Sequence, residues 1–129
     1  MSHDLELGPL GQVARAVTDI TKAEGWYRDV LGLAHLYTYG KLAFFDCAGT
    51  RLLIEERSQI EDSGLQNDSV LYFRVPDIKT AHDELTARGV SFTQGPHMIF
   101  KHPDGTEEWM AFFSDPDEKP LAIMSQVAP

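Results

Sequence analysis

The sequence predicts an α/β (α+β) fold built from two βαβββ modules, and two observations lead to that prediction. The first is an internal repeat, in which a strand, an Asp-Ile helix start and a following alanine occur twice, 58 positions apart. The repeated residues are Val13, Val17, Asp19, Ile20 and Ala23, then Leu71, Val75, Asp77, Ile78 and Ala81. The second is a glycine just past each helix, Gly32 and Gly89. We therefore expect two equivalent modules that share a concave face.

The composition fits one compact domain and excludes several classes of function. The chain has 129 residues, of which 43% are hydrophobic and 24% charged, as is ordinary for a globular protein. Its net charge of −9 argues against nucleic acid or an anionic membrane as a partner. No apolar run approaches the ~20 residues that cross a bilayer. The acidic N-terminus lacks a basic stretch, so we expect cytoplasmic residence.

The first module is expected over about residues 10–56. Residues 10–17 form its first strand, and an apolar stripe at helical spacing follows: Ile20, Ala23, Trp26, Tyr27, Val30 and Leu31. Thr18 or Asp19 caps the helix start, and Gly32 suits the left-handed position past its end. Strands are expected at 34–39, 42–47 and 51–56. The polar segment 57–68 is then the linker between modules.

The second module is expected over about residues 69–126 and repeats this order. Its elements are a strand at 70–75, a helix at 77–88, an extended segment at 90–101 interrupted at Gly95-Pro96, and strands at 106–113 and 120–126. His102-Pro-Asp-Gly105 is a strong turn signal. Together the modules predict a curved eight-stranded mixed sheet around a cleft, with the helices outside.

Two motifs carry a resemblance to a known family. They are Asp19-Ile followed by Trp26-Tyr27-Arg-Asp-Val-Leu-Gly-Leu33, and Phe112-Phe113-Ser-Asp-Pro-Asp117. With the element order, they make the chain resemble the vicinal oxygen chelate superfamily, which includes glyoxalase I, methylmalonyl-CoA epimerase, extradiol dioxygenases and bleomycin- or fosfomycin-resistance proteins. Residues 97–124 resemble its small glyoxalase-like branch. The resemblance implies the fold and a homodimer, but it does not identify the reaction.

The same resemblance bears on metal binding, because metal-dependent members place ligands on the first and last strand of each module. The matching positions here are Gln12, Leu53, Val70 and Ala122, with Glu55 further along the same face as Leu53. At best Gln12 and Glu55 remain as oxygen ligands, too few to hold a divalent ion. We therefore expect no metal at this site, and the sequence has no motif for any other cofactor.

The hairpin after the second helix supplies the candidate site. With a three-residue loop at Pro103–Gly105, Lys101 lies opposite Glu107 and Ile99 opposite Trp109. This register puts His97, Lys101, Glu107 and Trp109 on the sheet face turned away from the helices, the cup face. Met98, Phe100, Met110 and Phe112 then pack under the helix. The strand patterns add Tyr72 and Arg74 to the cup face, with Gln12 and Glu55 on its other wall.

Each candidate has a functional and a structural interpretation. His97 and Glu107 are the candidate catalytic residues, but His97 is as compatible with an ordinary strand histidine, and Glu107 with an ion pair to Lys101. Arg74 either anchors a substrate carboxylate or pairs internally with Glu55. The candidate substrate-binding residues are Gln12, Glu55, Tyr72, Arg74, Lys101 and Trp109.

The favoured function is a glyoxalase-like enzyme of lyase or isomerase type, acting on a small organic acid or carbonyl compound. The alternative is a metal-free protein that binds a small molecule or drug, as resistance proteins do. Its support is the loss of ligand residues and the acidic charge, which attracts cationic compounds. A purely structural module is the weakest of the three hypotheses, because a polar cup is costly without a ligand.

Overall fold

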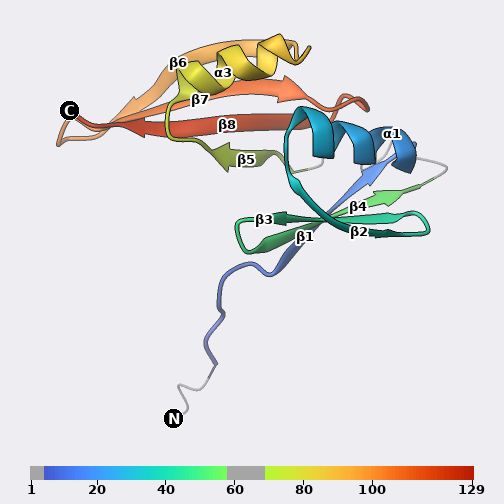
Figure 1. Cartoon of the computed structure of the whole chain (residues 1–129). Coiled ribbons are helices and arrows are strands. Elements are labelled where there is room, and N and C mark those ends of the chain that lie inside the picture. The colour runs from blue at the N-terminus through green and yellow to red at the C-terminus, as the bar shows by residue number, and fades with distance from the viewer. Residues whose placement is uncertain (1–4, 58–68) are drawn as a thin grey trace.

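The predicted fold is confirmed by the computed structural model, which describes residues 5–57 and 69–129 (Figure 1). Within these residues eight strands form two four-stranded sheets, sheet A in the order β1-β4-β3-β2 and sheet B in the order β5-β8-β7-β6. No hydrogen-bonded ladder joins the sheets in this part of the chain. The strands are β1 Gln12–Val17, β2 Ala34–Tyr39, β3 Leu42–Cys47, β4 Thr50–Glu56, β5 Leu71–Arg74, β6 Phe92–Lys101, β7 Glu107–Ser114 and β8 Pro120–Val127.

Both sheets have the same mixed topology, as the repeat predicts. The first strand of each module pairs in parallel with the last, β1 with β4 and β5 with β8. The remaining neighbours are antiparallel. A parallel pair needs a crossover, and in each module a helix follows the first strand. β1 and β5 are therefore both edge strands, with one side unpaired within their own sheets.

The helix of the first module changes its winding half-way. α1 spans Ile20–Gly25, and its N-cap Asp19 accepts a hydrogen bond from the backbone of Lys22 at 3.1 Å. It continues as the π-helix η1, Trp26–Val30. There the N–H of Leu31 donates to the carbonyl of Trp26, five residues back, at 3.2 Å. A π-turn accommodates one extra residue in a helix.

The second module has the shorter, regular version of this helix. α3 spans Ile78–Ala87, and its N-cap Asp77 accepts from Lys79 and Thr80. Hydrogen bonds from Thr80 hold the pKa of the Asp77 carboxyl below its usual value. Gly89 adopts φ +96° past the helix end, as Gly32 does at φ +75°. The two N-caps lie 58 positions apart, but the two glycines lie only 57 positions apart. The helix of the first module therefore contains one extra residue, which the π-turn of η1 accommodates.

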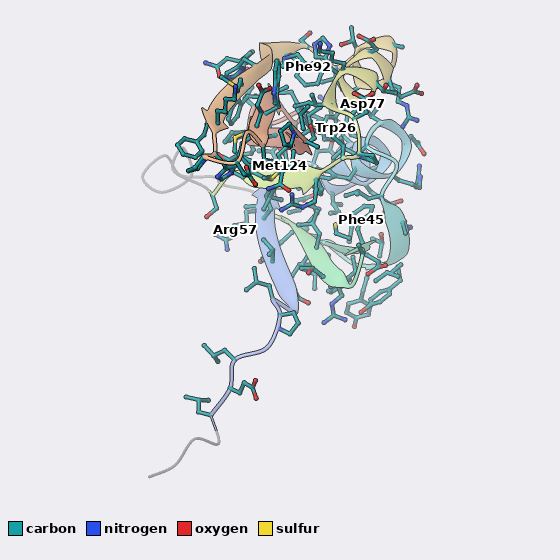
Figure 2. All side chains as sticks on the ribbon, turned by 90° about the vertical axis from the view of Figure 1, so that its left-hand side faces the viewer. Trp26, Phe45, Arg57, Asp77, Phe92 and Met124 are labelled. Atoms are coloured by element: carbon teal, nitrogen blue, oxygen red, sulfur yellow. The ribbon has the colours of Figure 1, made fainter. Side chains whose placement is uncertain are left out.

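The helices pack on one face of each sheet. One apolar core lies between α1 and sheet A around Tyr27, Phe45 and Ile54, and the other lies between α3 and sheet B around Phe113 and Leu121. Trp26 packs against both cores, and its ring centroid lies 6.4 Å from that of Phe113. Figure 2 shows it among the side chains between the two modules.

The predicted helix burial is largely confirmed. Ile78 and Leu85 are buried, whereas Trp26 and Val30 are half-buried at the contact between the modules. The first helix therefore lies between the sheets in Figure 1, while α3 covers sheet B alone.

A buried polar network also joins the modules and explains Arg15, an inward-facing charge in an otherwise apolar strand. Arg15 is 4% exposed and donates to the carbonyls of Ser69 and Pro120 at 2.8 and 2.7 Å. Beside it the Tyr27 hydroxyl donates to Asp115 Oδ2 at 2.7 Å. Burial and the neighbouring carboxylate of Asp115 raise the pKa of Tyr27. The network holds the first helix against the loop before β8.

Two further predictions concern regions around the fold. The expected linker 57–68 lies outside the described residues except for Arg57. Among the residues that the structure describes, no helix has the length and apolar character needed to cross a membrane.

Candidate functional site

The cup face of sheet B is the side turned away from α3, and strand register arranges its residues in rows. One row across β5, β8, β7 and β6 is Arg74, Met124, Met110 and His97. The row on one side is Tyr72, Ala122, Phe112 and Gln94. The row on the other side is Gln126, Glu108 and Phe100. The cup face therefore has an apolar centre with polar side chains around it.

Core packing decides which residues reach this face. Leu71 and Phe73 of β5, Leu121 and Ile123 of β8, and Phe113 of β7 all pack into the core under α3. Because side chains alternate along a strand, their neighbours Tyr72, Arg74, Ala122, Met124 and Phe112 point the other way. The sequence predicted this arrangement correctly for β5.

His97 lies at an irregular point of β6, where the pairing shifts between Gln94 and His97. Its Nδ1 is 2.7 Å from the carbonyl oxygen of Gly95. A carbonyl oxygen can only accept, so Nδ1 carries the hydrogen and Nε2 of the neutral ring has a free lone pair. The imidazole centroid lies 6.3 Å from that of Phe112. His97 is thus held in the tautomer that a general base requires.

Arg74 stands at the other end of the same row. Three inter-strand steps of about 4.8 Å place its Cα about 14 Å from that of His97. Within residues 5–57 and 69–129 its guanidinium forms no hydrogen bond or ion pair, although its charge acts on Glu108. The internal pair with Glu55 is not found among the described residues, in which Glu55 pairs with Arg57 at 3.9 Å. This observation favours the anchor interpretation of Arg74.

A second polar cluster surrounds Glu108. Its Oε2 is 2.7 Å from His102 Nε2 and accepts from Gln126 Nε2 at 2.8 Å. The hydrogen bond from His102, followed by that from Gln126, lowers the pKa of Glu108 from its usual value, and Arg74 adds a smaller effect. Glu108 is therefore an anion on the cup face rather than a proton donor.

The structure corrects the predicted position of three site residues. Glu107, Trp109 and Lys101 lie on the helix side of sheet B, opposite to His97 and Arg74. Trp109 Nε1 donates to Glu107 Oε1 at 2.8 Å, and Lys79 of α3 lies 5.7 Å from the Trp109 ring. Lys101 lies opposite Glu107 in the hairpin register as predicted, but no ion pair joins their side chains among the described residues. These three residues therefore do not share a cavity with His97.

Two physical causes explain this error. The pairing shifts between Met98 and Phe100, so Met98 rather than Ile99 lies opposite Trp109. The shift at this bulge reverses the face of His97 relative to Lys101. In addition, β7 is apolar on both faces, and alternation alone cannot say which face is inward.

Gln12 and Glu55 lie on the face of sheet A that is turned away from α1. Gln12 Oε1 accepts from Arg51 Nε at 2.7 Å, and the same guanidinium lies 5.2 Å from the Phe44 ring. No hydrogen bond, ion pair or ring contact joins Gln12 or Glu55 to the cup face of sheet B among the described residues. The prediction that they form its other wall therefore does not hold within one chain.

The residues at the family's ligand positions do not suit a divalent metal. Leu53, Val70 and Ala122 have no donor atom, and the side-chain oxygen of Gln12 is bonded to Arg51. In the described part of the chain no three His, Cys, Asp or Glu side chains are grouped for metal binding. We derive no chemistry that depends on a metal at these positions.

Sequence reasoning missed His102, Glu108 and Gln126. The sequence did contain a signal for the inward face of β7, the short loop Asp115–Lys119. This loop joins β7 to β8 in a hairpin in which Phe113 lies opposite Leu121. Leu121 pairs with Leu71 in turn, and Leu71 faces the core because it alternates with Tyr72, which the sequence places on the cup face. Following that chain of pairs from β5 to β7 puts Phe113 inward and hence Glu108 on the cup face.

Comparison with known proteins agrees with this architecture. A family model described as the Glyoxalase/Bleomycin resistance protein/Dioxygenase superfamily matches residues 10–123. The chain belongs to this superfamily. The uncharacterized protein YraH of Bacillus subtilis (strain 168) is 27% identical over 128 residues, covering 87% of this chain and 94% of that protein.

Solved structures of the superfamily have the same fold. A glyoxalase/bleomycin resistance protein/dioxygenase superfamily member from Sphaerobacter thermophilus is 25% identical, with a TM-score of 0.73 and coverage of 94% of this chain and 99% of that one. A lactoylglutathione lyase from Agrobacterium tumefaciens is 20% identical, with a TM-score of 0.70 and coverage of 93% and 95%. At that identity the second likeness concerns the fold alone.

Proposed function

We propose that the chain is a superfamily enzyme of lyase or isomerase type, acting on a small organic acid or carbonyl compound at the cup face of sheet B. The observation that carries the proposal is the row from Arg74 to His97. It combines a cation that has no hydrogen-bond or ion-pair partner among residues 5–57 and 69–129 with a histidine of fixed tautomer, and the apolar surface of Met124 and Met110 separates them. Such a surface suits a short molecule with a carboxylate at one end.

In this proposal each end of the row has one role. Arg74 binds the carboxylate through paired N–H donors. His97 Nε2 takes a proton from the carbon next to the carbonyl group, and the imidazolium returns it to the product. Tyr72 and Phe112, whose ring centroids are 5.9 Å apart, form the apolar wall beside the substrate. Glu107, the second catalytic candidate from the sequence, has no role in this proposal because it lies on the helix side of sheet B.

A metal-free binding protein of the resistance type is the second candidate. It is favoured by the Glu108 carboxylate, which stays ionised between His102 and Gln126. The exposed aromatic side chains of Tyr72 and Phe100 lie on the same face. An anion beside aromatic surface attracts organic cations, so this candidate predicts a cationic ligand and no turnover.

Proton exchange tests the enzyme proposal directly. Small 2-hydroxy and 2-oxo acids are incubated with the protein in D2O, and NMR follows deuterium at the carbon that bears hydrogen next to a carbonyl group, which is C2 of a 2-hydroxy acid and C3 of a 2-oxo acid. We expect exchange with wild type and its loss, by at least 100-fold, in His97→Ala. His35→Ala is the matched control, because His35 bonds Thr38 on sheet A and should leave exchange unchanged. Equal exchange in His97→Ala and wild type would sink the proposal.

The anchor role of Arg74 has its own matched variant. Arg74→Ala should raise KM about tenfold, which corresponds to about 1.4 kcal/mol, with a smaller effect on kcat. Arg51→Ala removes a cation from sheet A and should leave KM unchanged, because Arg51 is already bonded to Gln12. Thermal-shift titration with acids and with organic cations separates the two candidate functions. Homodimer formation and cytoplasmic residence remain predictions from the sequence.

A further inference from the structure

A pocket lies on the helix side of sheet B, at the end of the sheet where α3 begins. Its volume is about 460 Å³, and the first residues of α3 and the last residues of β8 line it. Figure 1 shows the start of α3 at the end of the sheet near the C-terminus. β5 ends at Arg74 whereas β8 continues to Val127, so this part of β8 has no neighbour on the β5 side within sheet B. The pocket is separate from the row of Arg74 and His97 on the cup face.

The internal repeat shows what fills the same place in the first module. The β1–β4 register puts Glu56 opposite Val17. The β5–β8 register, continued by one residue, puts Ser125 opposite Val75, the repeat equivalent of Val17. Ser125 therefore takes the place of Glu56. Glu56 Oε1 accepts a hydrogen bond from the N–H of Ile20, the first residue of α1, at 2.9 Å. The first module thus supplies a carboxylate to its helix start from its own chain.

The second module has no such carboxylate, and two hydrogen-bond donors are left at the pocket. Ile78, the first residue of α3, is 3% exposed, and its N–H has no acceptor within the helix. It forms no other hydrogen bond among residues 5–57 and 69–129. Ser125 is 2% exposed and alternates with Met124, so its side chain points to the helix side and into the pocket. Its hydroxyl has no partner in the described chain either. A buried donor without an acceptor is costly, so the pocket favours a ligand that accepts.

The charges around the pocket favour an anionic acceptor. Lys79 lines the pocket and is exposed, so its ammonium can reach a ligand there. The start of α3 adds the positive end of the helix dipole. Asp77 also lines the pocket, but its carboxylate accepts from the N–H groups of Lys79 and Thr80 and from the Thr80 hydroxyl. In the first module Asp19 caps α1 in the same way, and the Glu56 carboxylate still binds beside it.

The rest of the pocket wall is apolar. Trp109 lies opposite Ser125 in the β7–β8 register, and Pro76 and Val127 line the pocket with it. The indole Nε1–H of Trp109 already donates to Glu107 at 2.8 Å. The ring therefore offers apolar surface rather than a hydrogen bond to a ligand, and Glu107 is used within the chain.

We propose that this pocket binds a small organic carboxylate whose remaining part is apolar. The ligand carboxylate takes the place that the Glu56 carboxylate has in the first module. It accepts hydrogen bonds from the Ile78 N–H and the Ser125 hydroxyl, and Lys79 pairs with its charge. The apolar part of the ligand lies against Trp109.

NMR titration with benzoate tests the proposal. The Ile78 amide and the Trp109 indole N–H are followed in an isotope-labelled protein at low ionic strength. We expect both signals to move along one saturation curve, while the indole signal of Trp26 stays in place. Benzamide has nearly the same shape without the charge. It should bind about tenfold more weakly, because an ionised acceptor forms the stronger hydrogen bonds.

Four variants sharpen the test. Ser125→Glu restores the carboxylate of the first module, so it should abolish benzoate binding and move the Ile78 signal toward its bound position without ligand. Lys79→Gln should weaken binding about fivefold through the loss of an exposed charge pair. Lys22→Gln is its matched control, because Lys22 lies in the first turn of α1, and it should leave binding unchanged. Arg74→Ala should also leave binding unchanged, because Arg74 lies on the cup face.

Three results would overturn the proposal. The first is that benzoate moves neither the Ile78 nor the Trp109 signal, or that Lys79→Gln binds it as well as Lys22→Gln. The second is that sulfate moves both signals with the affinity of benzoate, since the pocket then takes any anion. The third is loss of binding in Arg74→Ala, which would place benzoate on the cup face. If Ser125→Glu does not fold, the two lysine variants still decide. Proton exchange at His97 has no part in these measurements, so this proposal and the proposed enzyme activity can fail separately.

Discussion

The two modules share one plan but differ in how each uses its outer surface. On sheet A the guanidinium of Arg51 is bonded to Gln12 and lies near the Phe44 ring. On sheet B Arg74 has no such partner in the described chain and shares a row with His97. The repeat therefore determines the architecture twice, whereas the residues of the site that we propose lie on one of the two sheets. By the 58-residue repeat Arg74 corresponds to Ala16, so the two modules share backbone positions but not the side chains that carry charge.

The helices differ in a related way. Trp26 of η1 corresponds by the 58-residue repeat to Glu84 of α3. Trp26 packs against both cores, whereas Glu84 is exposed and pairs with Arg88 at 3.3 Å. The first helix is thus the contact between the modules, and the second serves its own sheet.

The largest expected effect comes from removing that contact. Trp26→Ala should lower the free energy of unfolding by about 3 kcal/mol, since truncating a large aromatic leaves a cavity shared by both cores. Glu84→Ala, at the repeat-equivalent position, should change it by less than about 0.5 kcal/mol. Urea unfolding followed by fluorescence of Trp109 and by circular dichroism measures both. Similar losses in the two variants would contradict the distinction between the helices.

The buried polar network should have the next largest effect. Tyr27→Phe removes the hydroxyl that donates to Asp115 Oδ2, leaving a buried carboxylate oxygen without that partner. The expected loss is about 1–3 kcal/mol of unfolding free energy. Tyr39→Phe is the control, because Tyr39 is 76% exposed. Stability of Tyr27→Phe equal to that of the control would mean that this hydrogen bond does not join the modules.

The smallest effect concerns Glu108 and depends on pH. Its pKa is lowered in the folded chain by His102 and Gln126. A carboxyl with a depressed folded pKa stabilises the protein above its unfolded pKa, near 4.3, and this contribution is lost as pH falls through the folded value. Wild type should therefore exceed Glu108→Gln in stability at pH 6, with the difference shrinking below pH 4. A difference that is constant with pH would argue against the ionised carboxylate.

The sequence was sufficient for the elements and their order. Asp19 and Asp77 predicted both helix starts, and the glycines after each helix predicted both ends, because these signals are local. It was not sufficient for the faces of β6 and β7. One bulge between Met98 and Phe100 and a strand apolar on both sides removed the alternation on which that assignment depended. A local pattern also cannot explain a buried arginine at position 15, since its partners Ser69 and Pro120 are 54 and 105 residues away.

The extra residue in η1 also breaks the symmetry that a perfect repeat would impose. With two identical helices, each module would contact the other in the same way. Exchanging the order of the two modules along the chain would then change the contact between them little. The π-turn lets the adjacent residues Trp26 and Tyr27 both face inward, with their rings edge to face at 5.0 Å. The first helix can then serve two cores, and α3 has no matching pair of aromatic residues. Because of this one residue, the first module supplies the helix that contacts both cores, and the second module does not.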